Sequence, residues 1–430
     1  MSALTRTIAV ACVQLRAHES DAFAERWPAI VETIAEAIRK GAELVVVPEG
    51  TVPNYVIGDS QPEIKTLESA AADLCVLSKQ ANSTIVLGGA RYRSPGELVN
   101  SAWVITPAGI VGYADKCFLW HFDRKWFRAA DALEPIDTPV GRLGIFICAD
   151  GRIPTIGSTL VDRGAELLVV PTAWVTSGRD PAALENLQAD LFVTVRAREN
   201  RVPLVAANKV GVEYGSVAYC GKSAIIDADG TFVARGSERD EETIHGRITT
   251  REPSARHRAT ISVSAGAALP ASMRIAITPE PVGAARTLLE RYARLADAAL
   301  VIGPEGSVDA YGEIGIVRGD DLWDPAALVE PRLAGTRIFI WHANTPVEWT
   351  TRLARTRAAE LRAYFVVFDA PTGRAFAVDP EGVVLCGTFD TFRIAAFSFD
   401  RARTDAWNVA PHTNVADGLR AVERLASGRL

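Results

Sequence analysis

The stretch Gly141–Pro154, with the sequence GRLGIFICADGRIP, joins an apolar strand to a turn that leads into a predicted helix. Its run Leu143–Ile147 has the length and apolar character of a buried strand, and Cys148 follows at the end of that run. A lone cysteine in such a run is more often a buried packing residue than a nucleophile. On a strand-to-helix turn, however, a thiol lies near free backbone N–H groups, which can lower its pKa and stabilise an oxyanion. The stretch therefore predicts an α/β type of fold and marks Cys148 as a candidate nucleophile.

The same alternation of strands and helices extends over about the first 260 residues. Ile8–Leu15 is expected to form a buried strand, and Ala22–Lys40 has apolar residues at helical spacing and stops at Gly41, a favourable residue after a helix. Further strands are predicted at Glu43–Pro48, Thr84–Tyr92, Val99–Thr106, Arg142–Ile147, Glu166–Val170, Pro203–Ala207 and Ser223–Ile226, and further helices at about Glu63–Ala81 and Pro181–Asn200. This order is typical of a layered α/β or α+β architecture.

The second part of the chain begins after a segment rich in Ala, Ser, Gly and Pro at about Thr249–Ser272, which reads as a linker. We therefore expect a first domain over residues 1–250, a linker over residues 251–272 and a second domain over residues 273–430.

The second domain is predicted to be a shortened copy of the first. Asp297–Gly306 (DAALVIGPEG) matches Gly41–Gly50 (GAELVVVPEG), and internal duplication explains the match economically. The copy is much shorter, so we expect that the block corresponding to Lys116 and Cys148 is missing and that only Glu305 has a counterpart in the first domain.

Composition excludes several classes of protein. The 430 residues carry a formal net charge of −6, which gives no basic surface for nucleic acid. No apolar run reaches the length of a membrane span, and the N-terminus resembles no signal peptide, so we expect a cytoplasmic protein without membrane contact. The six cysteines include no C-x-x-C pair, which suggests neither a disulfide framework nor a metal site.

Three residues of the first domain are placed for chemistry at the ends of apolar strands. They are Glu49 after Leu44–Pro48, Lys116 after Ile110–Asp115, and Cys148. Partial desolvation would raise the pKa of the Glu49 carboxyl toward that of a useful base. Each residue alone has an ordinary explanation as a loop, surface or packing residue, so the argument rests on their joint context.

That context resembles the carbon-nitrogen hydrolase family, also called the nitrilase superfamily. The resemblance runs in order through the glutamate, lysine and cysteine motifs and three later stretches, over about Thr7–Thr249: Val45–Gly50, Asn100–Leu119, Gly141–Pro154, Glu166–Trp174, Arg196–Gly211 and Gly221–Gly230. It implies a four-layer αββα sandwich, followed here by a shortened second copy of that sandwich.

The resemblance also implies the roles of the three residues. Cys148 would be the nucleophile, Glu49 the general base and Lys116 the stabiliser of the tetrahedral intermediate, with the N–H of Ala149 as a second oxyanion donor. An amine or ammonia would leave, and water would hydrolyse a thioester. This chemistry implies no metal and no organic cofactor.

Two details bear on the substrate. Many members have a second glutamate in an E-x-R-x-F pattern, whereas this chain has Asp123 and Lys125 in Asp-Arg-Lys-Trp-Phe, which leaves the usual role of that acid open. The sequence Cys148-Ala-Asp150 resembles amidases and N-carbamoyl hydrolases more than nitrilases, so a small amide is the expected substrate. An N-carbamoyl amino acid or a nitrile is the alternative.

Four motif-adjacent residues are candidates for lining a substrate pocket: Trp120, His121, Arg152 and Trp174. Packing at a sheet end explains each aromatic residue equally well, and a structural ion pair explains Arg152 better.

A different class of function is a binding or regulatory protein whose triad is a relic. The intact Glu49, Lys116 and Cys148 argue against it for the first domain.

Because family members commonly dimerise through the helical face of the sandwich, the second copy is expected to act as an intramolecular pseudo-dimer partner, and further homo-oligomerisation stays open.

Overall fold

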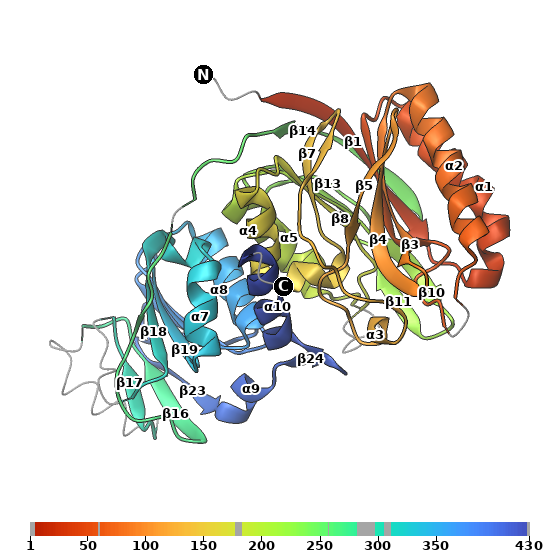
Figure 1. Ribbon diagram of the computed structural model, residues 1–430. Coiled ribbons are helices and arrows are strands. Elements are labelled where there is room, and N and C mark those ends of the chain that lie inside the picture. The colour runs from red at the N-terminus through yellow and green to blue at the C-terminus, as the bar shows by residue number, and fades with distance from the viewer. Residues whose placement is uncertain are drawn as a thin grey trace. The chain divides into compact units, whose positions relative to one another are not determined.

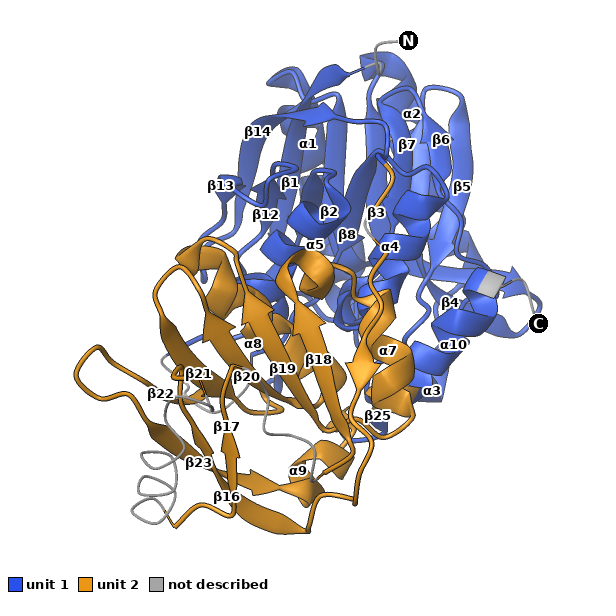
Figure 2. Cartoon of the chain, turned by 90° about the vertical axis from the view of Figure 1, so that its left-hand side faces the viewer, with its two compact units in different colours: residues 1–254, 410–413, 417–430 blue, residues 255–409, 414–416 orange. Residues whose placement is uncertain are grey.

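The computed structural model describes residues 5–58, 61–176, 183–256, 258–281, 297–304 and 311–427. It divides into two compact units (Figure 2). Unit 1 comprises residues 1–254, 410–413 and 417–430, and unit 2 comprises residues 255–409 and 414–416. None of the helices in the described part of the chain has the length and the apolar character that a membrane crossing requires.

The first sheet of unit 1 has eight strands in the order β11-β10-β1-β2-β3-β4-β5, with β14 also paired to β1. Strands β1, β2 and β3 run parallel, and β3, β4 and β5 form an antiparallel meander. The strands are β1 (Arg6–Arg16), β2 (Leu44–Val52), β3 (Thr84–Ser94), β4 (Glu97–Thr106), β5 (Gly109–Asp115), β10 (Lys209–Glu213), β11 (Val217–Cys220) and β14 (Glu242–Thr250).

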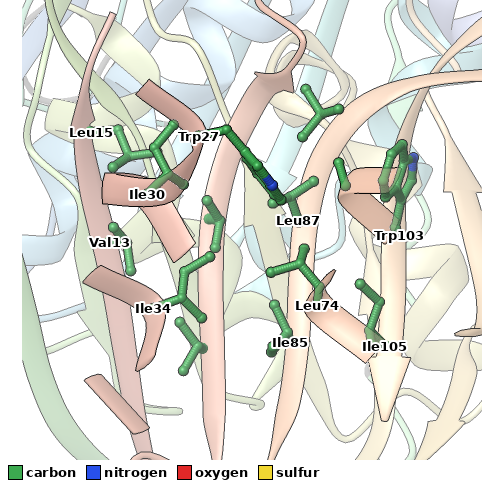
Figure 3. Packing of buried hydrophobic residues seen from close by; sticks show 14 of the residues in the cluster. Val13, Leu15, Trp27, Ile30, Ile34, Leu74, Ile85, Leu87, Trp103 and Ile105 are labelled. Carbon is green, nitrogen blue, oxygen red and sulfur yellow. The ribbon is translucent and has the colours of Figure 1, made fainter. Parts of the chain in front are cut away.

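Two helices, α1 (Phe23–Arg39) and α2 (Ile64–Ala81), cover one face of this sheet. Ile30 and Ile34 recur at helical spacing on α1, and they pack with Leu74 of α2 against buried strand residues (Figure 3). All three side chains are almost completely buried. Helical periodicity in the sequence therefore fixes which faces of α1 and α2 meet the sheet.

The second sheet of unit 1 has six strands in the order β13-β12-β9-β8-β7-β6, and β2 of the first sheet contacts β8 and β9. Helices α4 and α5 contact β7 and β9, which completes the αββα layering (Figure 1). The elements are β6 (Ile136–Thr138), β7 (Gly141–Ile145), β8 (Leu167–Pro171), β9 (Leu204–Ala207), β12 (Ala224–Ile226), β13 (Phe232–Arg235), α4 (Pro154–Asp162) and α5 (Val193–Asn200).

Short helical segments connect these layers: η1 (Ser20–Ala22), α3 (Asp123–Trp126), η2 (Cys148–Arg152) and the π-helix η3 (Gln188–Phe192). The single helix predicted over Pro181–Asn200 is thus η3 followed by α5 in its described part, and residues 177–182 lie outside the described residues.

Unit 2 contains a six-stranded sheet in the order β15-β18-β19-β20-β21-β22 and a three-stranded sheet in the order β17-β16-β23. Its elements are β15 (Ser262–Val263), β16 (Ser272–Ile277), β17 (Leu300–Ile302), β18 (Ile314–Arg318), η4 (Gly319–Trp323), α7 (Ala326–Leu333), β19 (Ile338–Ala343), α8 (Val347–Leu361), β20 (Tyr364–Asp369), β21 (Arg374–Val378), β22 (Val384–Gly387), β23 (Ala395–Asp400) and α9 (Arg401–Asp405).

The six-stranded sheet of unit 2 has the same strand directions as the second sheet of unit 1. In each, three central strands run parallel, namely β18-β19-β20 and β7-β8-β9, and antiparallel strands flank them on both sides. A turn of 3-10 helix and a helix follow β18, as they follow β7. The first residues of these turns, Gly319 and Cys148, both have a φ of 47°.

This arrangement bears on the expectation that a shortened second copy lacks the block holding Cys148. The turn that follows β18 begins at Gly319 and the turn that follows β7 begins at Cys148, so the thiol of the second turn has no equivalent in the first. Among the described residues of unit 2, no strands correspond to β4 and β5, which precede Lys116. Glu305 lies outside the described residues.

The two compact units divide the end of the chain differently from the predicted domains. The predicted second domain extends to residue 430, but residues 410–413 and 417–430 belong to unit 1. They include most of α10 (Val415–Ser427), which follows β24 (Asn408–Ala410) and β25 (Thr413–Asn414). A Cβ on Gly418 would lie 2.6 Å from Ile153 Cδ1 and 2.7 Å from Phe118 Cδ2, so the backbone of α10 lies directly against these side chains.

Candidate active site

Three elements of unit 1 bring the candidate residues together. Glu49 lies within β2, Lys116 follows the last residue of β5, and Cys148 begins η2. Glu49 and Lys116 are completely buried, and Cys148 is 6% exposed. The site is therefore built from β2 and the end of β5 in the first sheet and from the turn after β7 of the second sheet, and it is largely shielded from solvent.

Lys116 is the centre of a buried network of charges. Its Nζ lies 2.7 Å from Oε1 of Glu49 and 2.6 Å from Oδ2 of Asp123. Asn100 Nδ2 also donates to Oε1 of Glu49, at 2.7 Å, whereas Oε2 has no hydrogen-bond partner among the described residues. One oxygen of Glu49 is thus held in place and the other is free to accept a proton.

Asp123 occupies the position at which the sequence left the role of the second acid open. It is completely buried, and it accepts hydrogen bonds from Tyr55 Oη at 3.1 Å and from the N–H of Trp120 at 3.0 Å. Burial alone would lower the pKa of Lys116, but Asp123, Glu49 and Cys148 together raise it well above its ordinary value. Lys116 therefore stays charged.

Cys148 is held on a strained turn and has a protonated thiol. Its φ of 47° is in the left-handed region, which is uncommon for residues other than glycine. Burial and the neighbouring Glu49 raise the pKa of the thiol, and this outweighs the opposite effects of Lys116, the Thr172 side chain and the backbone of Ala173. A neutral thiol needs a base to become a nucleophile, and the Glu49 carboxylate is close enough to affect its titration.

Asp150 connects the cysteine turn to the segment that follows Lys116. Its carboxylate accepts N–H hydrogen bonds from Ile147 at 2.9 Å, Phe118 at 2.6 Å and Cys117 at 3.1 Å. Burial raises the pKa of Asp150 to about 7 although these N–H groups and Lys116 lower it. In the sequence, Asp150 served only as an indicator of substrate class, and the structure adds this bridging role.

The four candidate pocket residues make three different kinds of contact. The guanidinium carbon of Arg152 lies 5.1 Å from the centre of the Trp120 ring, so these two residues form a cation–π pair. Trp174 is 1% exposed, and its backbone N–H donates to Asn208 Oδ1 at 2.7 Å, as expected for packing at a sheet end. His121 is partly buried, and its N–H donates to Thr413 Oγ1 at 2.7 Å.

Sequence reasoning missed two tyrosines beside the triad, Tyr55 and Tyr219. Burial raises the pKa of both hydroxyls. Asp123 and Glu49 raise the pKa of Tyr55 further, and Glu213 and Glu49 raise that of Tyr219, which places both phenols near Glu49. Their ring centres are 6.3 Å apart. Tyr55 follows the glutamate motif closely and could have been selected for that reason. Tyr219 lies just before the stretch Gly221–Gly230, but no local pattern relates it to the distant Tyr55.

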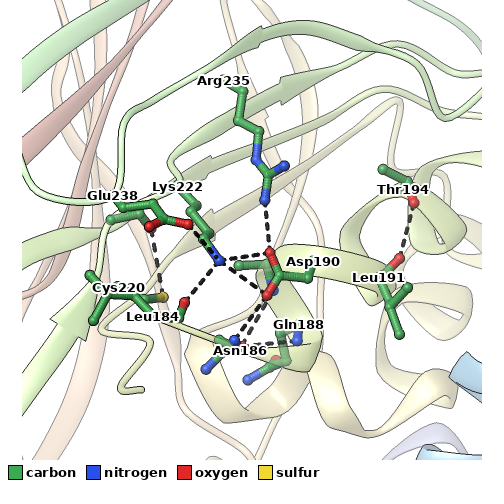
Figure 4. Close-up of polar contacts among 12 residues, drawn as sticks. Leu184, Asn186, Gln188, Asp190, Leu191, Thr194, Cys220, Lys222, Arg235 and Glu238 are labelled. Carbon is green, nitrogen blue, oxygen red and sulfur yellow. Dashed lines mark hydrogen bonds and ion pairs between the residues drawn. The ribbon is translucent and has the colours of Figure 1, made fainter. Parts of the chain in front are cut away.

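A second polar cluster in unit 1 contains several paired charges (Figure 4). Lys222 Nζ donates to Asp190 Oδ1 at 2.9 Å and to the carbonyl oxygen of Leu184 at 2.8 Å, and it lies 3.3 Å from Glu238. Arg235 also binds Asp190, at 2.8 Å. These contacts attach η3 to the second sheet, and the cluster is therefore structural.

The described residues hold no group of three or more His, Cys, Asp or Glu side chains arranged for a metal ion. All six cysteines are free thiols.

Comparisons with known proteins agree with this geometry. Residues 9–255 match the family model described as carbon-nitrogen hydrolase. A protein named probable nitrilase from Schizosaccharomyces pombe is 28% identical over 243 residues, which are 55% of this chain and 86% of that protein. An (R)-stereoselective amidase from a Pseudomonas species is 28% identical over 202 residues, which are 46% of this chain and 70% of that protein.

Among solved structures, a carbon-nitrogen hydrolase from Helicobacter pylori G27 has a similar fold. Its TM-score is 0.51 and its identity 24%, over 56% of this chain and 89% of that one. This likeness confirms the fold expected for the first part of the chain.

Proposed function

This chain belongs to the carbon-nitrogen hydrolase family, and on that premise we propose that it hydrolyses a small amide through a thioester on Cys148. The observation that carries the proposal is the arrangement of Glu49. One of its oxygens is held by Lys116 and Asn100, while the other lies without a partner among the described residues, in a site with a protonated thiol.

The reaction begins when Glu49 takes the proton of the Cys148 thiol and sulfur bonds to the amide carbon. The carbonyl electrons move to oxygen, and the ammonium of Lys116 and the N–H of Ala149 stabilise this negative charge. When the tetrahedral intermediate collapses, the carbon–nitrogen bond breaks and the leaving amine takes the proton from Glu49. A thioester remains on Cys148.

Hydrolysis of the thioester uses the same carboxylate. Glu49 accepts a proton from the attacking water, sulfur leaves as the carbon–oxygen bond forms, and the proton returns to the thiol. Asp123 accepts a hydrogen bond from Lys116 in this scheme, and it keeps the ammonium directed toward the reacting oxygen. Trp120, His121, Arg152 and Trp174 are proposed to shape the substrate pocket.

Two other substrate classes compete with a simple amide. An N-carbamoyl amino acid would follow the same steps, and a nitrile would form a thioimidate in place of the first tetrahedral intermediate. The relatives include proteins named nitrilase and amidase, so they do not choose between these classes. The sequence Cys148-Ala-Asp150 favours the amide. A competing proposal of another class is a binding protein with a relic triad.

The first prediction is that intact-mass analysis of the full chain, mixed with small amides and rapidly quenched, detects one acyl adduct per chain. Peptide mapping is expected to place the adduct on Cys148. Cys148→Ala should abolish the adduct and lower amide turnover by more than about 10³-fold, because it removes the nucleophile. Cys386→Ala is the matched control in unit 2 and should behave as the wild type.

Undiminished turnover by Cys148→Ala would refute the proposal. An adduct with carbamoyl amino acids or nitriles alone would shift it to those substrates. No adduct and no turnover with any of the three classes would favour the binding protein.

A further inference from the structure

A second buried ion pair lies next to the proposed triad, on β10. Lys209 and Glu213 are its first and last residues, and both side chains are completely buried. Their charged atoms, Nζ and Oε2, are 3.5 Å apart. Residues i and i+4 of a strand share one face of the sheet, so both side chains point to the same side of β10.

Lys209 binds the start of the segment that follows Glu49. Its Nζ donates to the carbonyl oxygen of Gly50 at 2.7 Å. Gly50 has a φ of 56°, and a Cβ there would lie 2.5 Å from the Cα of Tyr55. The chain therefore turns back tightly on itself at Gly50. We call residues 50–56, which comprise the end of β2 and the four residues after it, the 50–56 loop.

Glu213 binds the other end of this loop. Its Oε1 accepts the N–H of Val56 at 2.7 Å and Asn54 Nδ2 at 3.1 Å, and its Oε2 accepts Tyr219 Oη at 2.7 Å. His18 contacts the middle of the loop, with Nε2 2.6 Å from the carbonyl oxygen of Pro53. Since a carbonyl oxygen accepts, this ring nitrogen carries the hydrogen.

The 50–56 loop is connected to the catalytic charges in two ways. Its first residue follows Glu49, and Tyr55 donates from the loop to Asp123, which holds Lys116. A shift of the loop would therefore displace both carboxylates that contact the Lys116 ammonium.

The Lys209–Glu213 pair also places two charged groups close to the site. Burial lowers the pKa of Lys209, and Glu213 and Glu49 oppose this effect. Burial raises the pKa of Glu213, but Lys209, the N–H of Val56, Tyr219 and Asn54 outweigh it and keep the pKa below its ordinary value. Four groups face the pair: Glu49 from β2, His18 from the segment after β1, Asn54 from the 50–56 loop and Tyr219 from β11.

We propose that Lys209 and Glu213 are positioning residues for the reaction at Cys148, and this inference rests on the function proposed above. They hold residues 50–56 at both ends and so fix the carboxylate of Glu49 and the Tyr55–Asp123 contact. A buried ion pair often stabilises a fold no better than apolar residues of similar size. Stability alone is thus a weak reason for two buried charges here.

The test compares the double variant Lys209→Met/Glu213→Gln with wild-type full-length chain. Changing both residues avoids leaving one unpaired buried charge. We expect kcat for an amide to fall about 10- to 100-fold with KM changed less than about threefold. Lys209→Arg, which keeps the charge, should recover most of kcat.

The matched control is Arg357→Met/Glu360→Gln on α8 of unit 2, a completely buried pair with charged atoms 2.7 Å apart. It should lower the melting temperature without changing kcat. If the β10 variant also loses only thermal stability, the pair is merely structural and the inference is wrong.

A second readout separates this inference from the proposed function. The rate of alkylation of Cys148 by iodoacetamide, followed by peptide mapping, reports the base and the thiol without turnover. A wild-type chain that turns over no amide would contradict the proposed function alone. An unchanged alkylation rate in the β10 variant would contradict the positioning role, whatever the substrate is.

Discussion

Lys116 shows at the scale of a single residue why the site needs two acids. A completely buried ammonium is costly unless it is paired, and Lys116 contacts both Glu49 and Asp123. If Glu49 becomes neutral when it takes the thiol proton, Asp123 still balances the ammonium. The shorter acid at position 123 therefore serves the purpose because Lys116 lies within 2.6 Å of it.

The second prediction concerns this acid. Asp123→Asn is expected to lower kcat about 10²- to 10³-fold. In this variant the Lys116 ammonium is balanced by Glu49 alone, so the transfer of the thiol proton to Glu49 costs more free energy. Steady-state kinetics with an amide measure the effect. Asp131→Asn, at an exposed carboxylate, is the control and should leave kcat unchanged. Full kcat in the Asp123→Asn variant would show that Glu49 alone is sufficient to balance the charge of Lys116.

Single residues also show how far the sequence predicts the site. Glu49, Lys116 and Cys148 were identified because each ends an apolar strand within a recognisable motif, and the structure brings all three into one buried cluster. Asn100 and Lys209 were not identified. Their contacts with Glu49 and Gly50 span 51 and 159 residues, and no local pattern indicates which distant strand will supply a donor.

At the scale of elements, the strands and helices of unit 1 follow the sequence closely. The predicted strand Ile8–Leu15 lies within β1, and the predicted helix Glu63–Ala81 corresponds to α2. Periodicity and turn residues are local signals, so they define such elements well. Helix α10 was not placed, because a helical pattern does not reveal which unit its buried face will contact.

The third prediction tests the docking of α10. In an exposed helix, replacing glycine by alanine stabilises the fold by up to about 1 kcal/mol. Gly418→Ala should do the opposite and destabilise unit 1 by about 1–3 kcal/mol, because the added Cβ would overlap Ile153 and Phe118. Thermal or denaturant unfolding measures the change. Glu423→Ala on the exposed face of α10 is the control, and a stabilised Gly418→Ala would show that α10 does not pack here.

At the scale of the whole molecule, similar hydrogen bonds occur inside unit 1 and inside unit 2. Arg196 of α5 donates to the carbonyl oxygen of Gly151 in η2 at 3.0 Å, and Arg357 of α8 donates to that of Leu322 in η4 at the same distance. Each arginine also pairs with a glutamate three residues later, at 2.7 Å. Such correspondences support our proposal that unit 2 arose by duplication of unit 1.

Two turns that follow corresponding strands agree with this proposal. The N–H of Asp227 donates to the carbonyl oxygen of Thr231 at 2.9 Å, and the N–H of Asp379 donates to that of Val383 at 2.9 Å. In both turns the aspartate side chain accepts two further backbone N–H groups. Because unit 2 has glycine at position 319 and no counterpart of β5 among its described residues, we propose that it is non-catalytic.

The fourth prediction concerns the proposal that unit 2 replaces a second subunit by covering the helical face of unit 1. In monomeric full-length chain, isolated by size exclusion, cross-linking with mass spectrometry should join the helices of unit 1 to residues of unit 2 within one molecule. Cross-links between strands of the first sheet and α1 are the control for a folded unit 1. If α4 and α5 cross-link only to helices of another chain, unit 2 is not a pseudo-dimer partner.

The position of α10 has a consequence for the synthesis of the protein. A ribosome makes the chain from its N-terminus, and domains generally fold in that order. The residues of α10 that cover Phe118 and Ile153 are nevertheless made after unit 2. Unit 1 thus completes its packing beside the Lys116 segment only once unit 2 has been translated. A chain released before α10 would carry every residue of the triad and still lack this contact, so translation through α10 becomes a condition for a fully assembled first unit.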